Sequence, residues 1–125
     1  YRLNCGFKLW QDGYDGAMNY AYQHAMGFIW NDFDHEVYRD HVFAYPTADG
    51  VLDTIAWEGF REGVDDVRYL SLLLSRAAIA GGPVESHSKI MTDDIARFIR
   101  SLRSARISDP GKVRSEIISF LMNEN

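Results

Sequence analysis

The longest periodic segment of the sequence is "TIAWEGFREGVDDVRYLSLLLSRAAIA", residues 54–80. Its apolar side chains recur every three or four positions, which is the spacing of one buried face of an α-helix. These side chains are Ile55, Trp57, Phe60, Val64, Val67, Leu70, Leu73, Leu74 and Ala77. Asp53 or Thr54 can cap the first turn, and "AGGP" at residues 80–83 breaks the pattern. The segment therefore predicts one long helix.

Charged side chains cover the rest of this helix. Glu58 and Arg61, Arg61 and Asp65, and Asp65 and Arg68 are spaced three or four residues apart. This spacing is typical of ion pairs along a helix, although paired carboxylates can also serve as a catalytic acid and base. We favour the ion pairs.

Two glycines interrupt the same helix. Gly59 and Gly63 each cost about 0.5–1 kcal/mol relative to Ala in a helix interior. Because they are four residues apart, they lie on one face. We expect another stretch of backbone to pack closely against that face.

The other elements are shorter. Leu3, Phe7 and Trp10 predict a helix over residues 2–11, followed by a reversal at the two Asp-Gly pairs of "QDGYDG". Alternation in "AMNYAYQ" predicts a strand over residues 17–23.

Residues 23–53 have no clean period and read as a long structured loop, in which "YPTADG" marks an extended segment and a turn. Two helices follow the long one, the first capped by Thr92 and the second beginning at Asp109-Pro110.

Composition limits the classes of function. The chain has 125 residues, 46% of them hydrophobic and 25% charged, as in a globular domain. A net charge of -5 with scattered Lys and Arg argues against nucleic acid as a partner, because phosphate binding needs a basic face. No apolar run approaches the ~20 residues that span a bilayer, so we expect no membrane partner. A single cysteine excludes an internal disulfide.

The aromatic residues gather in the first half, around "GFIWNDFDHEVYRDH" at residues 27–41. Flat rings beside acids and amides are what a sugar-binding surface needs, for stacking and for hydroxyl groups. An aromatic core is the alternative. The candidate sugar-binding residues are Tyr20, Tyr22, Trp30, Asp32 and Tyr45.

The acids and histidines of the same stretch could also hold a divalent metal. Asp32, Asp34, His35, Glu36 and His41 offer suitable atoms, but their spacing matches no specific metal motif. We favour a simpler interpretation, in which these side chains satisfy the backbone of an irregular loop. We therefore predict no metal and no cofactor.

Three segments together carry a resemblance to a known family. "GYDGAMNYAY" (13–22), "NDFD" (31–34) and "YPTADGVLDTIAWEGFREGVDDVRYLSLL" (45–73) resemble the C-terminal end of the catalytic domain of glycoside hydrolase family 123. The likeness covers about residues 1–75. It implies an α/β fold that is mostly α in this part: the last strand and last helices of a (β/α)8 barrel.

In that arrangement residues 2–11 would be the seventh helix, 17–23 the eighth strand and 54–80 the eighth helix. Residues 1–80 would belong to the barrel, and 81–125 would form a helical extension with two capping helices. A barrel binds its ligand at the C-terminal ends of its strands, which places Tyr20, Tyr22, His24 and the loop over residues 30–34 at the mouth.

The resemblance also implies an activity. Family members hydrolyse β-N-acetylgalactosaminides with the substrate's own acetamido group as nucleophile, assisted by an Asp-Glu pair on an earlier strand. That pair would precede Tyr1, which suggests that the chain is a piece of a longer polypeptide, so no catalytic residue is assigned here. The family's aromatic residue on the last strand falls at Tyr20, and its Tyr-Pro falls at Tyr45-Pro46.

We therefore expect part of a glycoside hydrolase that acts on glycans such as N-acetylhexosaminides. The chain would supply a pocket wall, with the carbohydrate and the remainder of its own barrel as partners. The alternative is a non-catalytic helical interaction module, in which the aromatic half is core and the two terminal helices bind a protein. A metal-dependent hydrolase is a more distant possibility.

Overall fold

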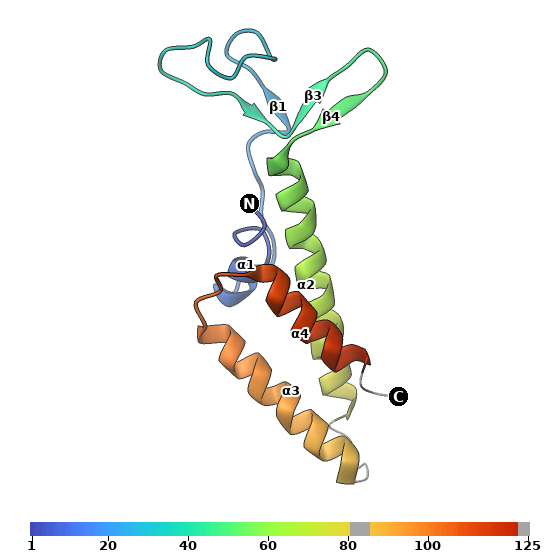
Figure 1. The fold of residues 1–125 in the computed structure, drawn as a ribbon. Helices are drawn as coiled ribbons and strands as arrows, with labels where there is room; N and C mark the ends of the chain where they lie inside the picture. Colours follow the sequence, from blue (N-terminus) through green and yellow to red (C-terminus); the bar gives the residue numbers. More distant parts are fainter. Residues whose placement is uncertain (81–85, 123–125) are drawn as a thin grey trace.

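The long helix expected over residues 54–80 forms as α2, Ile55–Ala80, and the other elements gather at its two ends (Figure 1). The computed structural model describes residues 1–80 and 86–122. Within these ranges the chain is a mixed α/β domain, about half helical, with two small antiparallel sheets. Short strands and loops lie beyond the N-terminal end of α2, and three helices lie along the rest of it.

Side-chain caps fix where two of the helices begin. Thr54 Oγ1 accepts a hydrogen bond from Trp57 N at 3.2 Å and donates one to Phe43 O at 2.8 Å. This confirms Thr54 as the cap of α2 and ties the helix to the preceding strands. Asp109 Oδ1 accepts from Lys112 N at 3.0 Å, which confirms the predicted start of α4, Pro110–Met122.

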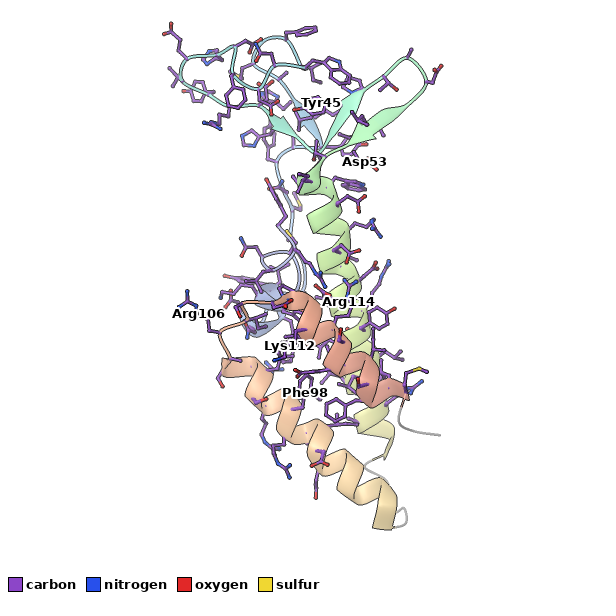
Figure 2. The ribbon with its side chains drawn as sticks, in the orientation of Figure 1. Tyr45, Asp53, Phe98, Arg106, Lys112 and Arg114 are labelled. Carbon is purple, nitrogen blue, oxygen red and sulfur yellow. The ribbon has the colours of Figure 1, made fainter. Side chains whose placement is uncertain are left out.

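The helices α1 (Phe7–Gln11), α3 (Ser86–Ser104) and α4 enclose the main core with the C-terminal part of α2. The buried side chains of this core are Phe7, Leu70, Leu73, Ile95, Leu102, Ile107 and Ile117. Leu3 and Trp10 pack against them, as their helical spacing predicts. Figure 2 shows Phe98 and Arg114 on this side of the molecule and Tyr45 at the opposite end.

Two short hairpins form the other end, which we call the head, residues 17–54. Strand β1, Gln23–His24, pairs with β2, His41–Val42; strand β3, Ala44–Pro46, pairs with β4, Val51–Asp53. Thr47 N donates to Gly50 O at 2.9 Å and closes the turn expected in "YPTADG".

Aromatic rings join the head to α2. The Phe43 ring lies 6.1 Å from that of Trp57 and 5.8 Å from that of Phe60, measured between centroids, and Tyr1 meets Phe43 edge-on at 5.2 Å. Phe43 is 6% exposed. This junction holds the head on the first turns of the helix.

Three predicted elements differ from the structure. Residues 2–6 are not helical: Gly6 leaves helical geometry, with φ -118° and ψ -116°, as it packs against Gly63. Residues 17–22 form no strand, since within the described chain they have no partner strand; only Gln23 and His24 pair. The loop over residues 23–53 contains the two hairpins instead.

The first of the two later helices was also placed wrongly. Thr92 lies inside α3, which begins at Ser86, so it is not the cap. Of the predicted helix stop "AGGP", only Ala80 is described; Gly81, Gly82 and Pro83 lie outside the described residues. The division at residue 80 stays a prediction, although α3 and α4 both pack on α2.

The glycine face of α2 is a backbone contact, as predicted. A Cβ atom on Gly63 would lie 2.7 Å from Arg2 O and 3.1 Å from Gly6 N. On Gly59 it would lie 3.2 Å from Tyr1 Cβ. Residues 1–6 therefore run directly against the helix, where no side chain fits.

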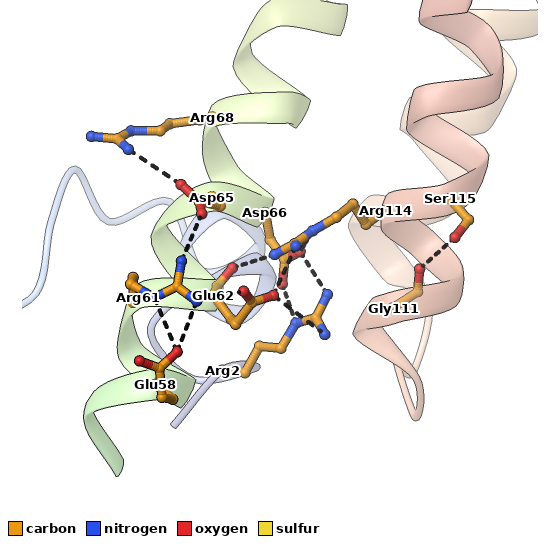
Figure 3. Close-up of polar contacts among 10 residues, drawn as sticks. All are labelled: Arg2, Glu58, Arg61, Glu62, Asp65, Asp66, Arg68, Gly111, Arg114 and Ser115. Carbon is orange, nitrogen blue, oxygen red and sulfur yellow. Dashed lines mark hydrogen bonds and ion pairs between the residues drawn. The ribbon is translucent and has the colours of Figure 1, made fainter. Parts of the chain in front are cut away.

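A buried carboxylate fixes three segments together (Figure 3). Asp66 is fully buried and accepts from Arg2 Nε at 2.8 Å, Arg2 Nη2 at 2.9 Å and Arg114 Nε at 2.5 Å. Arg114 also reaches Glu62, 2.8 Å between Nη1 and Oε2. The N-terminal segment, α2 and α4 thus share one ionic network.

Candidate functional site

Three of the five residues expected to bind sugar meet in the head. The rings of Trp30 and Tyr45 are stacked, 5.0 Å between centroids and 18° between planes. The Tyr45 hydroxyl donates to Asp32 Oδ1 at 2.8 Å. Trp30 is 45% exposed, so the group is open to solvent.

The strands and the loop before them position this group. Tyr45 lies in β3, opposite Leu52 of β4, and its partners lie in the loop between β1 and β2. That loop is braced by its own side chains: Asp34 Oδ2 accepts from Phe28 N at 2.5 Å, and Asn31 Oδ1 accepts from Phe33 N at 3.2 Å. Loop bracing by acids and amides was the favoured prediction for this stretch, and it is confirmed.

The surroundings of Tyr45 are negative. Its hydrogen bond with Asp32, followed by partial burial and by the charges of Asp32 and Asp40, raises the pKa of the Tyr45 phenol above 10.0. The neutral phenol is therefore the form that stabilises this arrangement. Asp32 Oδ2 accepts no hydrogen bond from the described residues, which leaves it available to a ligand hydroxyl.

The other two predicted residues lie elsewhere in the head. Tyr22 packs edge-on against Trp57 of α2, 5.9 Å between centroids, and belongs to the junction. Tyr20 lies beside the β1–β2 hairpin, 5.4 Å from His24 and 5.9 Å from His41 between ring centroids. Both tyrosines are about half exposed or more.

Tyr20 lines a pocket of about 460 Å³. The remaining lining residues are His24, Met26, Val37, Tyr38, Arg39 and His41. Its volume lies within the range of about 300–1,000 Å³ that is usual for small-molecule sites. His24 and His41 face each other across the two strands.

Sequence reasoning placed His24 at the expected mouth but did not find the pocket. Tyr38 and Arg39 received no role. The pocket depends on the pairing of β1 with β2, and each of these strands has only two residues. Such short strands have no alternation to detect, so the sequence carries no signal for this cluster.

The head also differs from the helices in its surface. Large apolar side chains lie exposed over it, among them Met18, Phe28, Phe33, Val37 and Val51. It holds six Asp and Glu side chains and one Arg, a net charge of -5 that equals the net charge of the whole chain.

The described residues contain no group of three or more His, Cys, Asp or Glu side chains placed to hold a metal. Two candidate ligands are engaged with backbone instead: Asp34 as above, and His35 Nδ1, which lies 3.1 Å from Tyr38 N. Among the helices of the described ranges, none is long and apolar enough to cross a membrane.

Comparison of the chain with protein-family models, curated proteins and solved structures found no match.

Proposed function

We propose that this chain forms one wall of a carbohydrate-binding site in a glycoside-hydrolase-like protein. The observation that carries the proposal is the stacked pair of Trp30 and Tyr45, with Asp32 fixed beside it by the phenol. A sugar ring offers C–H groups to an aromatic face and hydroxyl groups to a carboxylate. The three side chains present both kinds of contact at one place.

Pre-organisation supports this assignment. The hydrogen bond from Tyr45 holds Asp32 in place, and the stacking holds Trp30, so a ligand would meet side chains that are already ordered. Ordering costs are a large part of the free energy lost on binding. Removing either ring should therefore weaken binding more than the lost contact area alone implies.

The sequence resemblance supports the wider context. In a family 123-like barrel, α1 and α2 would take the places of the seventh and eighth helices. Residues 17–22 would become the eighth strand beside the remainder of the barrel, which would also cover the exposed apolar side chains of the head. This chain would then bind and orient the glycan, while an Asp-Glu pair elsewhere in the barrel supplies the proton.

The alternative of a helical interaction module would need the aromatic half as core. Tyr20, Tyr22 and Trp30 are instead 67%, 48% and 45% exposed. The described parts of α3 and α4 use their apolar faces against α2 and α1. The burial pattern thus favours a ligand site on the head.

Calorimetric titration with an aryl N-acetyl-β-hexosaminide tests the proposal. We expect saturable binding that Trp30→Ala weakens by about two- to tenfold, since an aromatic contact contributes on the order of 0.5–1.5 kcal/mol beyond its buried area. Asp32→Asn should weaken it too. Tyr14→Ala removes an exposed ring outside the head and should leave affinity unchanged.

Equal affinity of the parent chain and the Trp30→Ala chain would contradict the proposal. So would the absence of any binding heat with aryl hexosaminides and with the free sugars.

A further inference from the structure

The pocket beside the β1–β2 hairpin gathers hydrogen-bond donors. His24 and His41 are cross-strand neighbours, and the Tyr20 hydroxyl lies 3.3 Å from His24 Nδ1. Tyr38 and Arg39 complete the polar part of the wall. None of the residues that line this pocket is acidic, which is unusual in a head with six carboxylates.

Arg39 is the one arginine or lysine of the head, and it lies at this pocket. Its guanidinium carbon lies 5.0 Å from the centroid of the Phe33 ring, so the ring holds it in place. Within residues 1–80 and 86–122 it forms no ion pair, whereas Arg61 and Arg68 pair with acids of α2. A guanidinium without an ion pair can bind a carboxylate or a sulfate through two parallel hydrogen bonds, in bidentate geometry.

Two acids oppose such a ligand. Asp40 and Glu36 are close in sequence to the pocket, but neither lines it. Asp40 Oδ1 accepts from Met26 N at 2.8 Å. Salt screens the wider negative field of the head over about 8 Å, whereas a charge-assisted hydrogen bond acts at contact. The local donors therefore decide which ligand the pocket accepts.

We infer that this pocket binds the anionic group, a carboxylate or a sulfate, of an acidic sugar. Arg39 would bind the anion, and His41 and Tyr38 would donate further hydrogen bonds, whereas His24 is engaged with Tyr20 and Met26. The inference rests on the proposed function and adds the substrate class: an acidic glycan.

The pocket and the Trp30 group both belong to the head. His41 of β2 and Tyr45 of β3 lie in consecutive strands, with Phe43 between them. Asp40 links the two places, because it bonds Met26 at the pocket and its charge acts on Tyr45.

Paired sugars test this inference on the whole chain. The first pair is N-acetylglucosamine and the same sugar sulfated at its primary hydroxyl; the second is glucose and glucuronic acid. In each pair we expect the acidic sugar to bind at least about tenfold more tightly, as a charge-assisted hydrogen bond allows. The ring signals of His24 and His41 in NMR spectra should shift with the acidic sugars only.

Variants identify the responsible side chain. Arg39→Gln should remove the preference for the acidic sugar and keep the affinity for the neutral one. Arg103→Gln is the matched control, because Arg103 also lies over a ring, 4.5 Å from the centroid of Trp10, but in the helical part. It should leave both affinities unchanged.

Several results would overturn the inference. Equal binding of neutral and acidic sugars would do so while leaving the proposed function intact, as would tighter binding of glucosamine with its free ammonium group. Inorganic sulfate that shifts the histidine signals, without tighter binding of sulfated sugar, would show a site for the free anion only. If no sugar of any kind binds, both this inference and the proposed function fail.

Discussion

Tyr45 is the residue on which the candidate site depends, because it stacks on Trp30 and orients Asp32. Its phenol donates to a carboxylate, and loss of the proton would place two negative charges side by side. The hydrogen bond with Asp32 is the main cause of its raised pKa. Most of the geometry of the site therefore depends on one proton.

This predicts a pH dependence with a definite sign. The pKa of Tyr45 is higher in the folded than in the unfolded chain, so its contribution to stability is complete below pH 10.0 and is lost as pH rises through the folded value. In a titration of tyrosinate absorbance, we expect one late-titrating tyrosine that Tyr45→Phe removes. Asp32→Asn should lower the pKa of that tyrosine toward its ordinary value. A tyrosine that still ionises late in the Tyr45→Phe chain would contradict the assignment.

Among the elements, α2 shows what the sequence could predict. Its apolar face is confirmed at Leu70 and Leu73, but the prediction that Ile55 belongs to the buried face is wrong, since Ile55 is 94% exposed in the first turn. The cap at Thr54 and the ion pairs of Arg61 and Arg68 are confirmed, because each depends on residues within four positions of one another. The strand predicted over residues 17–23 is wrong for residues 17–22, for the opposite reason. A strand needs a partner backbone, and alternation in one segment does not supply it.

The glycine face of α2 gives an element-scale prediction. Gly63→Ala should raise helix propensity, yet its Cβ would lie 2.7 Å from Arg2 O. We expect a net loss of about 1–3 kcal/mol in the free energy of unfolding, measured by urea denaturation, because overpacking against backbone outweighs the gain. Gly16→Ala, with nothing within 4 Å of the added carbon, is the control and should change little. A stabilised Gly63→Ala chain would show that residues 1–6 do not pack on α2.

On the scale of the whole molecule, the sequence predicted which residues belong to the candidate site better than it predicted which residues contact one another. The aromatic rings and the carboxylate predicted Trp30, Asp32 and Tyr45 as sugar-binding residues. The fold brings them together although Trp30 and Tyr45 are 15 positions apart in the sequence. Nothing in the helical spacing distinguishes Asp66 from the exposed acids beside it, but it is fully buried. Its partners Arg2 and Arg114 are 64 and 48 residues away, beyond any local pattern.

This network is the connection among the N-terminal segment, α2 and α4. The hydrogen bonds that Arg2 donates to Asp66 raise the pKa of Arg2, so its guanidinium stays charged beside the buried carboxylate. Asp66→Asn should cost about 3 kcal/mol of unfolding free energy, since removing one partner leaves the charges of Arg2 and Arg114 uncompensated. Asp65→Asn, which removes only half-exposed pairs with Arg61 and Arg68, should cost much less. Equal losses in the two variants in urea denaturation would rule out this role.

The molecule thus separates into a helical part that contains the ion-pair network of Asp66 and a head with exposed rings, whose acids form hydrogen bonds but no ion pair among the described residues. We propose that the head binds sugar through Trp30. Fluorine NMR of the chain labelled with fluorotryptophan tests it directly, because Trp10, Trp30 and Trp57 report from the helical core, the site and the junction. On titration with an N-acetylhexosaminide, the account predicts a saturable shift of the Trp30 signal, with those of Trp10 and Trp57 unmoved; a stationary Trp30 signal at saturating sugar would contradict it.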